Sequence, residues 1–140
     1  MKIKLDIKTL GEDGYHIFCK VTVNGLSCRA LIDTGASKTV IGKKLAGKLK
    51  LTEFSNHKDN QMTGIQPGEM DVSFVNLESI KFGKLTFKDT IAGLIDLTHV
   101  SKQYKSINVK PFQLIIGGDI LYKGQAIIDY KNKILKLTKP

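Results

Sequence analysis

The chain has 140 residues, of which 41% are hydrophobic and 25% charged, a composition typical of a water-soluble globular protein with one core. Its apolar runs are too short to span a membrane, so we expect a single domain over residues 1–140 and no membrane partner. The net charge of +9 raises nucleic acid as a partner, but Arg29 is the one arginine among 22 basic residues. Because base and bidentate phosphate recognition rely on arginine, we interpret the scattered lysines as a solvated surface and expect no specific nucleic-acid partner. A preference for acidic partners remains open.

The N-terminal residues 1–8 lack the continuous apolar segment of a secretory signal, which favours a cytoplasmic location, although a removed leader would leave the same pattern. Cys19 and Cys28 belong to no disulfide framework and no metal-binding spacing, so we interpret both as buried free thiols. The three histidines match no metal motif either. We therefore expect neither a metal ion nor an organic cofactor.

The first part of the chain predicts strands. Residues 2–8 alternate aliphatic and charged side chains, residues 11–14 form a turn, and residues 15–32 form two strands joined by Asn24-Gly25, a dipeptide suited to a type I′ hairpin. This turn fixes the register, which places Val23 opposite Leu26, Val21 opposite Cys28, Cys19 opposite Ala30, and Ile17 opposite Ile32. All eight side chains then lie on one apolar face. The two cysteines are diagonal on that face, which is unfavourable for a disulfide.

Asp33 follows this hairpin at once, in the turn Asp33-Thr34-Gly35. At the edge of a core, burial and neighbouring charges can shift the pKa of a carboxyl group. Such a shift is what acid–base chemistry requires. A structural alternative is an Asx-turn acid that only shapes the end of the strand.

The middle of the chain predicts a short amphipathic helix over residues 43–50 and a polar, turn-rich loop over residues 55–68. Strands are predicted for residues 69–77 and 80–95, with a tight turn at Gly83-Lys84 inside the second.

The C-terminal part predicts a helix over residues 98–106 and a buried strand over residues 112–116. Gly117-Gly118 is a sharp turn, and Asp119 is predicted to cap a short helix that ends at Tyr122. Two strands follow as a hairpin, over residues 125–130 and 133–138. The terminal strands could complete the sheet of one chain or pair across a dimer.

Two motifs together resemble a known family. Ala-Leu-Ile-Asp-Thr-Gly-Ala-Ser at residues 30–37 and Leu-Ile-Ile-Gly-Gly-Asp-Ile-Leu at residues 114–121 are similar to the paired motifs of the retropepsin-like aspartic proteases, in the clan of the pepsins. The resemblance is to a single-domain, bacterial-type member and extends over residues 15–137. It implies a mainly β fold, a closed acid-protease barrel with one to three short helices.

The resemblance also implies roles for individual residues. Asp33 would be the catalytic carboxylate, Thr34 would hydrogen-bond beneath it, and Gly35 would let the substrate backbone approach. Residues 60–69 would form a flap over bound peptide, and residues 114–117 would form a strand behind the active-site turn. The substrate-binding residues would be Ala36 and Ser37 beside the turn and Met62, Thr63, Gly64 and Ile65 in the flap.

The family's reaction needs two adjacent carboxyl groups, one ionised to activate water and one protonated. Two carboxyl groups at that distance cannot both be ionised, because their negative charges repel. This chain has one Asp-Thr-Gly, so we expect a homodimer in which each copy contributes one Asp33. Asp119 and Asp129 are candidates for a second acid within the chain, but neither is followed by Thr-Gly. The alternative function is a monomeric, non-catalytic module that binds peptides or proteins.

Overall fold

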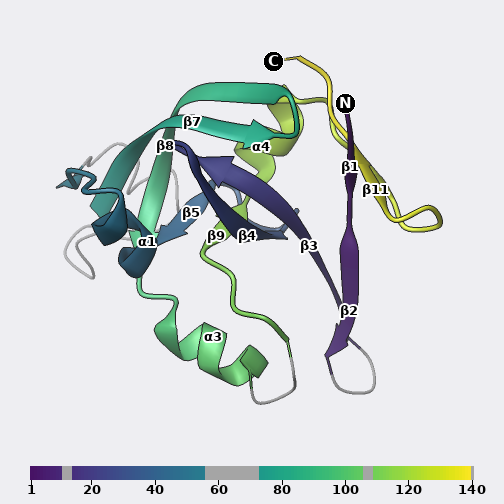
Figure 1. The fold of residues 1–140 in the computed structure, drawn as a ribbon, viewed down its shortest axis with the longest axis horizontal. Helices are drawn as coiled ribbons and strands as arrows, with labels where there is room; N and C mark the ends of the chain where they lie inside the picture. Colours follow the sequence, from purple (N-terminus) through teal and green to yellow (C-terminus); the bar gives the residue numbers. More distant parts are fainter. Residues whose placement is uncertain (11–13, 56–72, 106–108, 140) are drawn as a thin grey trace.

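The computed structural model describes residues 1–10, 14–55, 73–105 and 109–139, and these residues form a mainly β fold with three short helices (Figure 1). The strands are β1 (Lys2–Lys4), β2 (Asp6–Leu10), β3 (Gly14–Val23), β4 (Leu26–Ile32), β5 (Val40–Gly42), β6 (Phe54–Ser55), β7 (Ser73–Phe82), β8 (Leu85–Ile95), β9 (Leu114–Ile116), β10 (Ile127–Asp129) and β11 (Ile134–Lys136). The helices are α1 (Lys43–Lys48), α3 (Thr98–Lys105) and α4 (Gly118–Lys123).

Six strands close into a barrel in the order β3, β4, β9, β5, β8 and β7, and β7 pairs back onto β3 through Thr22–Lys81 and Val23–Ile80. β2 extends the sheet beside β3, and β6 extends it beside β7. β9 lies parallel to β4 and antiparallel to β5, so the late motif lies between two strands of the first half of the chain. The predicted mainly β, closed barrel with one to three short helices is confirmed.

The β3–β4 hairpin has the predicted register from Val23–Leu26 to Ile17–Ile32. Asn24 and Gly25 both have positive φ angles, 46° and 85°, as a type I′ turn requires. Cys19 and Cys28 are free thiols, as predicted; Cys19 is buried, whereas Cys28 is half-buried and not buried as expected. The turn therefore determines the register of the hairpin and, with it, the position of the end of β4.

The core has two parts because both faces of the hairpin are covered. Alternate residues of β3 point into the barrel, where they join the main cluster of buried aliphatic and aromatic side chains. On the outer face a smaller cluster packs beneath α3, and its Phe18 and Phe112 rings lie 5.6 Å apart. The smaller cluster consists of Phe18, Leu31, Leu97, Val109 and Phe112.

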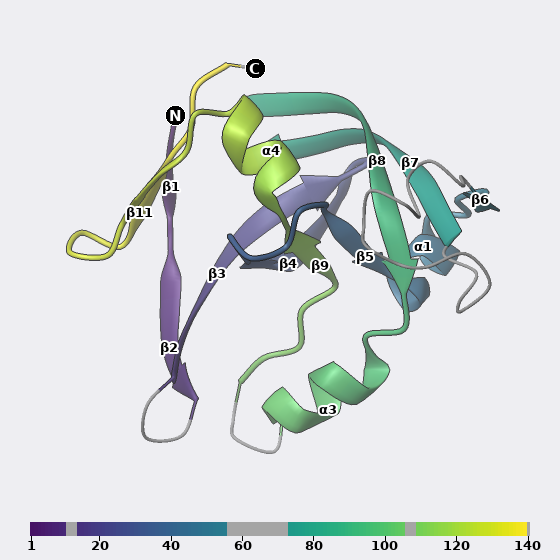
Figure 2. The same cartoon turned by 180° about the vertical axis from the view of Figure 1, so that it is seen from behind.

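The two ends of the chain meet in a separate three-stranded sheet, in which β11 lies between β1 and β10 (Figures 1 and 2). β1 pairs with β11 through Ile3–Leu135, and the amino terminus of Met1 donates a hydrogen bond of 2.8 Å to the carbonyl of Leu137. The terminal strands thus pair within one chain, one of the two arrangements that the sequence left open.

Other predicted elements differ in their bounds. β7 runs unbroken to Phe82 instead of ending at Leu77, because its whole length pairs with β8. Of the loop predicted for residues 55–68, Ser55 belongs to β6 and residues 56–68 lie outside the described residues. No helix in the described ranges is long and apolar enough to cross a lipid bilayer.

Candidate active site

Asp33 stands where β4 ends, at the start of a turn that its own groups hold together. Its backbone N–H donates a hydrogen bond of 3.0 Å to the carbonyl of Ile116 on β9. Its Oδ1 atom accepts a hydrogen bond of 2.9 Å from the Gly35 N–H, and its carbonyl accepts one of 3.2 Å from the Ala36 N–H. The half-buried carboxylate is thereby oriented by the backbone of the turn.

Gly35 leaves room for this carboxylate. A Cβ atom at position 35 would lie 3.2 Å from Asp33 Oδ1, which is closer than most such contacts in proteins. A side chain here would therefore crowd both the carboxylate and any molecule approaching it.

The late motif packs tightly against the active-site turn. The Gly118 N–H donates a hydrogen bond of 2.7 Å to the carbonyl of Ala36. A Cβ atom at Gly117 would lie 2.7 Å from that carbonyl oxygen and 2.8 Å from the carbonyl oxygen of Lys38, so only glycine fits without a backbone shift. The two motifs that are far apart in sequence form one packed unit (Figure 2).

A buried polar link joins the same two segments. The hydroxyl of Thr39, which is fully buried, donates a hydrogen bond of 2.7 Å to Asp119 Oδ1 and accepts one of 3.1 Å from the Gly117 N–H. The Thr39 N–H also donates to both carboxylate oxygens of Asp119, at 3.0 and 3.1 Å. This link satisfies groups that would otherwise be buried without partners.

The prediction that Asp119 caps a helix is therefore wrong. The N-cap position of α4 is Gly117, with no side-chain hydrogen bond, and Asp119 lies within the first turn of the helix. The packing of Gly117 against residues 36–38 starts the helix earlier than the sequence pattern indicates. The carboxylate of Asp119 is consequently directed to Thr39, which sequence reasoning missed.

The two acids considered as internal partners for Asp33 are both engaged elsewhere. Asp119 binds Thr39, and the carboxylate of Asp129 accepts hydrogen bonds of 2.9 and 2.8 Å from the backbone and side chain of Asn132. These hydrogen bonds lower the pKa of Asp129 from its ordinary value. No group of three or more potential metal ligands occurs within the described ranges.

The structure describes the predicted site residues around the turn but not those of the predicted flap. Thr34, Gly35 and Ser37 lie on the exposed side of the turn, and Ala36 is half-buried. The hydrogen bond to the Asp33 carboxylate comes from the Gly35 backbone, and the role of Thr34 beneath the site stays a prediction. The predicted flap residues Met62, Thr63, Gly64 and Ile65 lie outside the described residues.

A family model described as aspartyl protease matches residues 19–120, which include the first motif and all but the last residue of the second. The chain belongs to the aspartyl protease family. The match covers the whole unit built from the Asp33 turn, β9 and the start of α4. The resemblance drawn from the two motifs is therefore confirmed at the level of the aspartyl protease family.

Two relatives of this aspartyl protease chain come from yeasts. DNA damage-inducible protein 1 of Kluyveromyces lactis is 27% identical over 128 residues, which are 87% of this chain and 26% of that protein. UBA domain-containing protein Mud1 of Schizosaccharomyces pombe is 25% identical over 126 residues, which are 88% of this chain and 33% of that protein. The chain thus spans a third or less of the length of these two relatives.

Solved structures agree on the fold. A retropepsin-like aspartic protease from Rickettsia conorii matches with a TM-score of 0.58 and 21% identity, over 96% of this chain and 86% of that one. The retroviral protease-like domain of Ddi1 from Leishmania major matches with a TM-score of 0.54 and 18% identity, over 86% of each chain. At these identities the likeness concerns the fold alone.

Within the aspartyl protease fold, two position-setting residues were not found from the sequence. Thr39 opens an apolar strand and looks like an ordinary β-branched residue there. Asp119 follows two glycines before a helix, where a cap is the usual interpretation. A signal was present in the pair of motifs, since Thr39, just after the first motif, and Asp119, within the second, come close once the motifs pack together.

Proposed function

We propose that the protein is an aspartic endopeptidase that cleaves extended peptide segments, using one Asp33 from each of two copies of the chain. A water molecule between the two carboxyl groups is the nucleophile, and no covalent intermediate forms. One carboxylate takes a proton from the water, and the other, protonated, carboxyl donates to the carbonyl oxygen of the substrate. The observation that carries the proposal is the oriented Asp33 carboxylate, locked between the turn and the late glycines.

The second copy is needed because the chain supplies half of the pair. Asp119 and Asp129 use their carboxylates within the chain, so neither is available to face Asp33. A symmetric dimer brings two identical residues together at its two-fold axis. Both Asp33 residues then share one proton, because two adjacent negative charges repel.

A surface for a second copy is available at the three-stranded sheet. Among the described residues β10 pairs only with β11, at one edge of that sheet, so one side of its backbone could pair with a second copy. Two apolar side chains stand out there, with 59% of Ile127 and 58% of Tyr130 exposed. Because β1 already pairs with β11 within the chain, we expect the copies to meet at this outer edge and not by exchanging terminal strands.

The proposal is tested by incubating wild type and Asp33→Asn with a library of unfolded peptides at mildly acidic pH and reading cleavage by mass spectrometry. Wild type should cleave, and Asp33→Asn should lose all measurable activity. Asp89→Asn is the matched control, because Asp89 is exposed and its φ of 50° suits asparagine. Equal cleavage by wild type and Asp33→Asn would overturn the proposed function.

The second candidate is a monomeric module that binds peptides or proteins without cleaving them. The internal β1–β11 pairing favours it, because strands that could join two copies are used within one. Sedimentation with and without a peptide ligand separates the two functions. A monomer at all concentrations that binds the peptide without cleaving it would support the binding module.

The remaining expectations complete the proposal. We propose one domain over residues 1–140, a peptide or protein as substrate, no metal or organic cofactor, and no specific nucleic-acid partner. The cytoplasmic location stays a prediction from the N-terminal sequence.

A further inference from the structure

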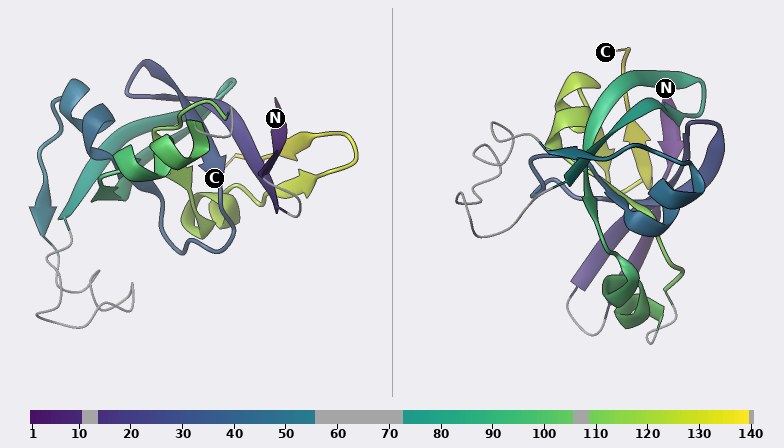
Figure 3. Two further views of the ribbon diagram at one scale, coloured as in Figure 1. Left: turned by 90° about the horizontal axis from the view of Figure 1, so that it is seen from below. Right: turned by 90° about the vertical axis from the view of Figure 1, so that its left-hand side faces the viewer.

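A pocket of about 460 Å³ opens between α1, α3 and the start of β4. Figures 1 and 3 show α1 and α3 as neighbours at one end of the barrel. Apolar side chains line its interior, among them the exposed Leu26 and Pro111 and the inner Leu45 and Leu97. A concave apolar surface of this kind can enclose a side chain of a bound molecule.

Four lysines surround this pocket. Lys44 and Lys48 come from α1, Lys102 and Lys105 come from α3, and all four are exposed. Among the described residues none of the four forms an ion pair with a carboxylate. Among the described residues of the lining Asp96 is the one acid, and its Oδ1 accepts a hydrogen bond of 2.9 Å from the Thr98 N–H at the start of α3. The pocket therefore carries a clear excess of positive charge.

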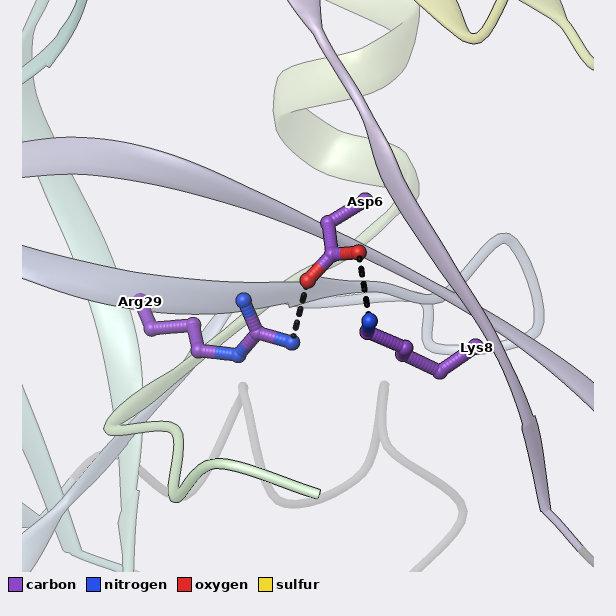
Figure 4. A network of polar contacts seen from close by, with 3 residues as sticks. All are labelled: Asp6, Lys8 and Arg29. Carbon is purple, nitrogen blue, oxygen red and sulfur yellow. Dashed lines mark ion pairs between the residues drawn. The ribbon is translucent and has the colours of Figure 1, made fainter. Parts of the chain in front are cut away.

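The positive surface continues along β4. A second hollow of about 610 Å³ shares Ser27 and Cys28 with the pocket and is lined by further basic residues, including Lys20 and Lys110. Among the described residues of this hollow Asp6 is the one acid. It is already paired with Arg29 and Lys8, at 2.9 and 3.5 Å (Figure 4). Its negative charge is thus largely compensated within the protein.

We propose that these two hollows form one docking groove for an acidic peptide segment that places an apolar side chain in the pocket between α1 and α3. The charge excess selects carboxylate-rich segments, and the apolar lining selects an anchor such as leucine. Nucleic acid fits less well, since Phe112, the one aromatic ring among the described residues of the lining, is 2% exposed and offers no surface for base stacking.

The groove is separate from the Asp33 site. Cys28 and Asp33 are five residues apart on an extended strand, which places them about 17 Å apart. Peptide docked here does not need the second copy of the chain or a cleavage step. Its binding is therefore measured independently of the proposed proteolysis, and either proposal can fail without the other.

The experiment measures fluorescence anisotropy of a labelled peptide that carries one leucine between two runs of glutamate, with full-length protein at low ionic strength. The double variant Lys48→Glu/Lys102→Glu should weaken binding by about tenfold or more, because attraction at two positions becomes repulsion. The matched control is Lys84→Glu/Lys88→Glu, which changes the net charge equally at exposed positions around the β7–β8 turn. That control should change the dissociation constant less than about twofold.

Two further probes test the apolar anchor and the class of ligand. Replacing the leucine of the peptide by glycine should weaken binding by about fivefold or more. An oligothymidylate with the same number of charges should bind more weakly than the leucine peptide. If circular dichroism shows that the first variant does not fold, Lys44→Glu/Lys105→Glu replaces the other two lysines around the pocket.

Three results would overturn the inference. Equal losses in the groove and control variants would show attraction by net charge alone. Equal binding of the leucine and glycine peptides would exclude the anchor. Tighter binding of the oligothymidylate, lost in the groove variants, would assign the groove to nucleic acid.

Discussion

Thr39 and Asp119 are linked by three hydrogen bonds, two from the Thr39 backbone N–H at 3.0 and 3.1 Å and one from its hydroxyl at 2.7 Å. The residues are 80 positions apart in the sequence. Because Gly117 and Gly118 on one side bind Thr39 and Ala36 on the other, the pair holds the turn that orients Asp33. The position of the proposed catalytic carboxylate thus depends on a link that contains no catalytic group.

Thr39→Val should destabilise the protein by about 1–3 kcal/mol, because it leaves the buried Gly117 N–H without a partner and removes the hydroxyl's hydrogen bond to Asp119 Oδ1, which keeps its backbone donors. The measurement is the free energy of unfolding in urea. Thr39→Ser retains the hydroxyl and should recover most of the loss. A valine variant as stable as wild type would contradict the role assigned to this link.

Gly117→Ala should unfold the protein or destabilise it by about 3 kcal/mol or more, because its Cβ would meet backbone oxygens at 2.7 and 2.8 Å. Gly118→Ala is the neighbouring control, since its Cβ would lie at an ordinary 3.5 Å from the Ala36 oxygen. Thermal unfolding compares the two variants. Similar melting temperatures would show that the backbone around Gly117 has room for a Cβ atom.

Asp6→Asn should reduce stability modestly near neutral pH. Burial raises the pKa of Asp6, but the hydrogen bond and charge of Arg29 and the charge of Lys8 outweigh it and lower the pKa from 3.8. A lowered pKa stabilises the fold above the unfolded value, and this contribution is lost as the pH falls below 3.8 through the folded value. Since the Asp6 side chain is 41% exposed, we expect about 0.5–1 kcal/mol.

The measurement for Asp6 is urea unfolding of wild type and Asp6→Asn at a series of pH values. The difference between the two proteins should be present near neutral pH and disappear in strong acid. A difference that stays constant across this series would show that the ion pair with Arg29 is not its source.

The two thiols should react slowly with iodoacetamide in the folded protein. Burial, and secondarily the nearby Cys28, raise the pKa of Cys19 to about 12, and burial raises that of Cys28 to about 11, against 9.0 for an ordinary thiol. Because the thiolate is the reactive form, alkylation at mildly alkaline pH should be at least about tenfold slower than in denaturant. Mass spectrometry over time measures it, and rapid labelling of the native chain would contradict this burial.

Local sequence signals predicted the parts of the fold that neighbouring residues decide. Asn24-Gly25 determined the hairpin and its register because few dipeptides tolerate two positive φ angles. Asp33 was placed correctly at the end of β4, because the alternating apolar residues before it form one face. The short helices were found in the same way, with their ends shifted by a few residues.

The parts of the fold that the sequence did not predict depend on contacts between residues far apart in the chain. Neither alternation nor turn residues indicate that β1 pairs with β11, since both strands carry similar lysine-rich patterns. The cap predicted for Asp119 failed because the packing of Gly117 against the active-site turn moves the start of α4. Such contacts depend on three-dimensional closure of the barrel, which a local pattern does not contain.

The central claim is that one active site uses Asp33 from two copies of the chain, and a titration of inactive subunits tests it most directly. Asp33→Asn protein is added in increasing amounts to a fixed amount of wild type, and the rate of peptide cleavage is measured after the subunits exchange. Mixed dimers carry one asparagine, so the rate should fall to about one half at equal amounts and continue to fall. A rate that stays constant throughout the titration, or wild type that does not cleave at all, would contradict the account.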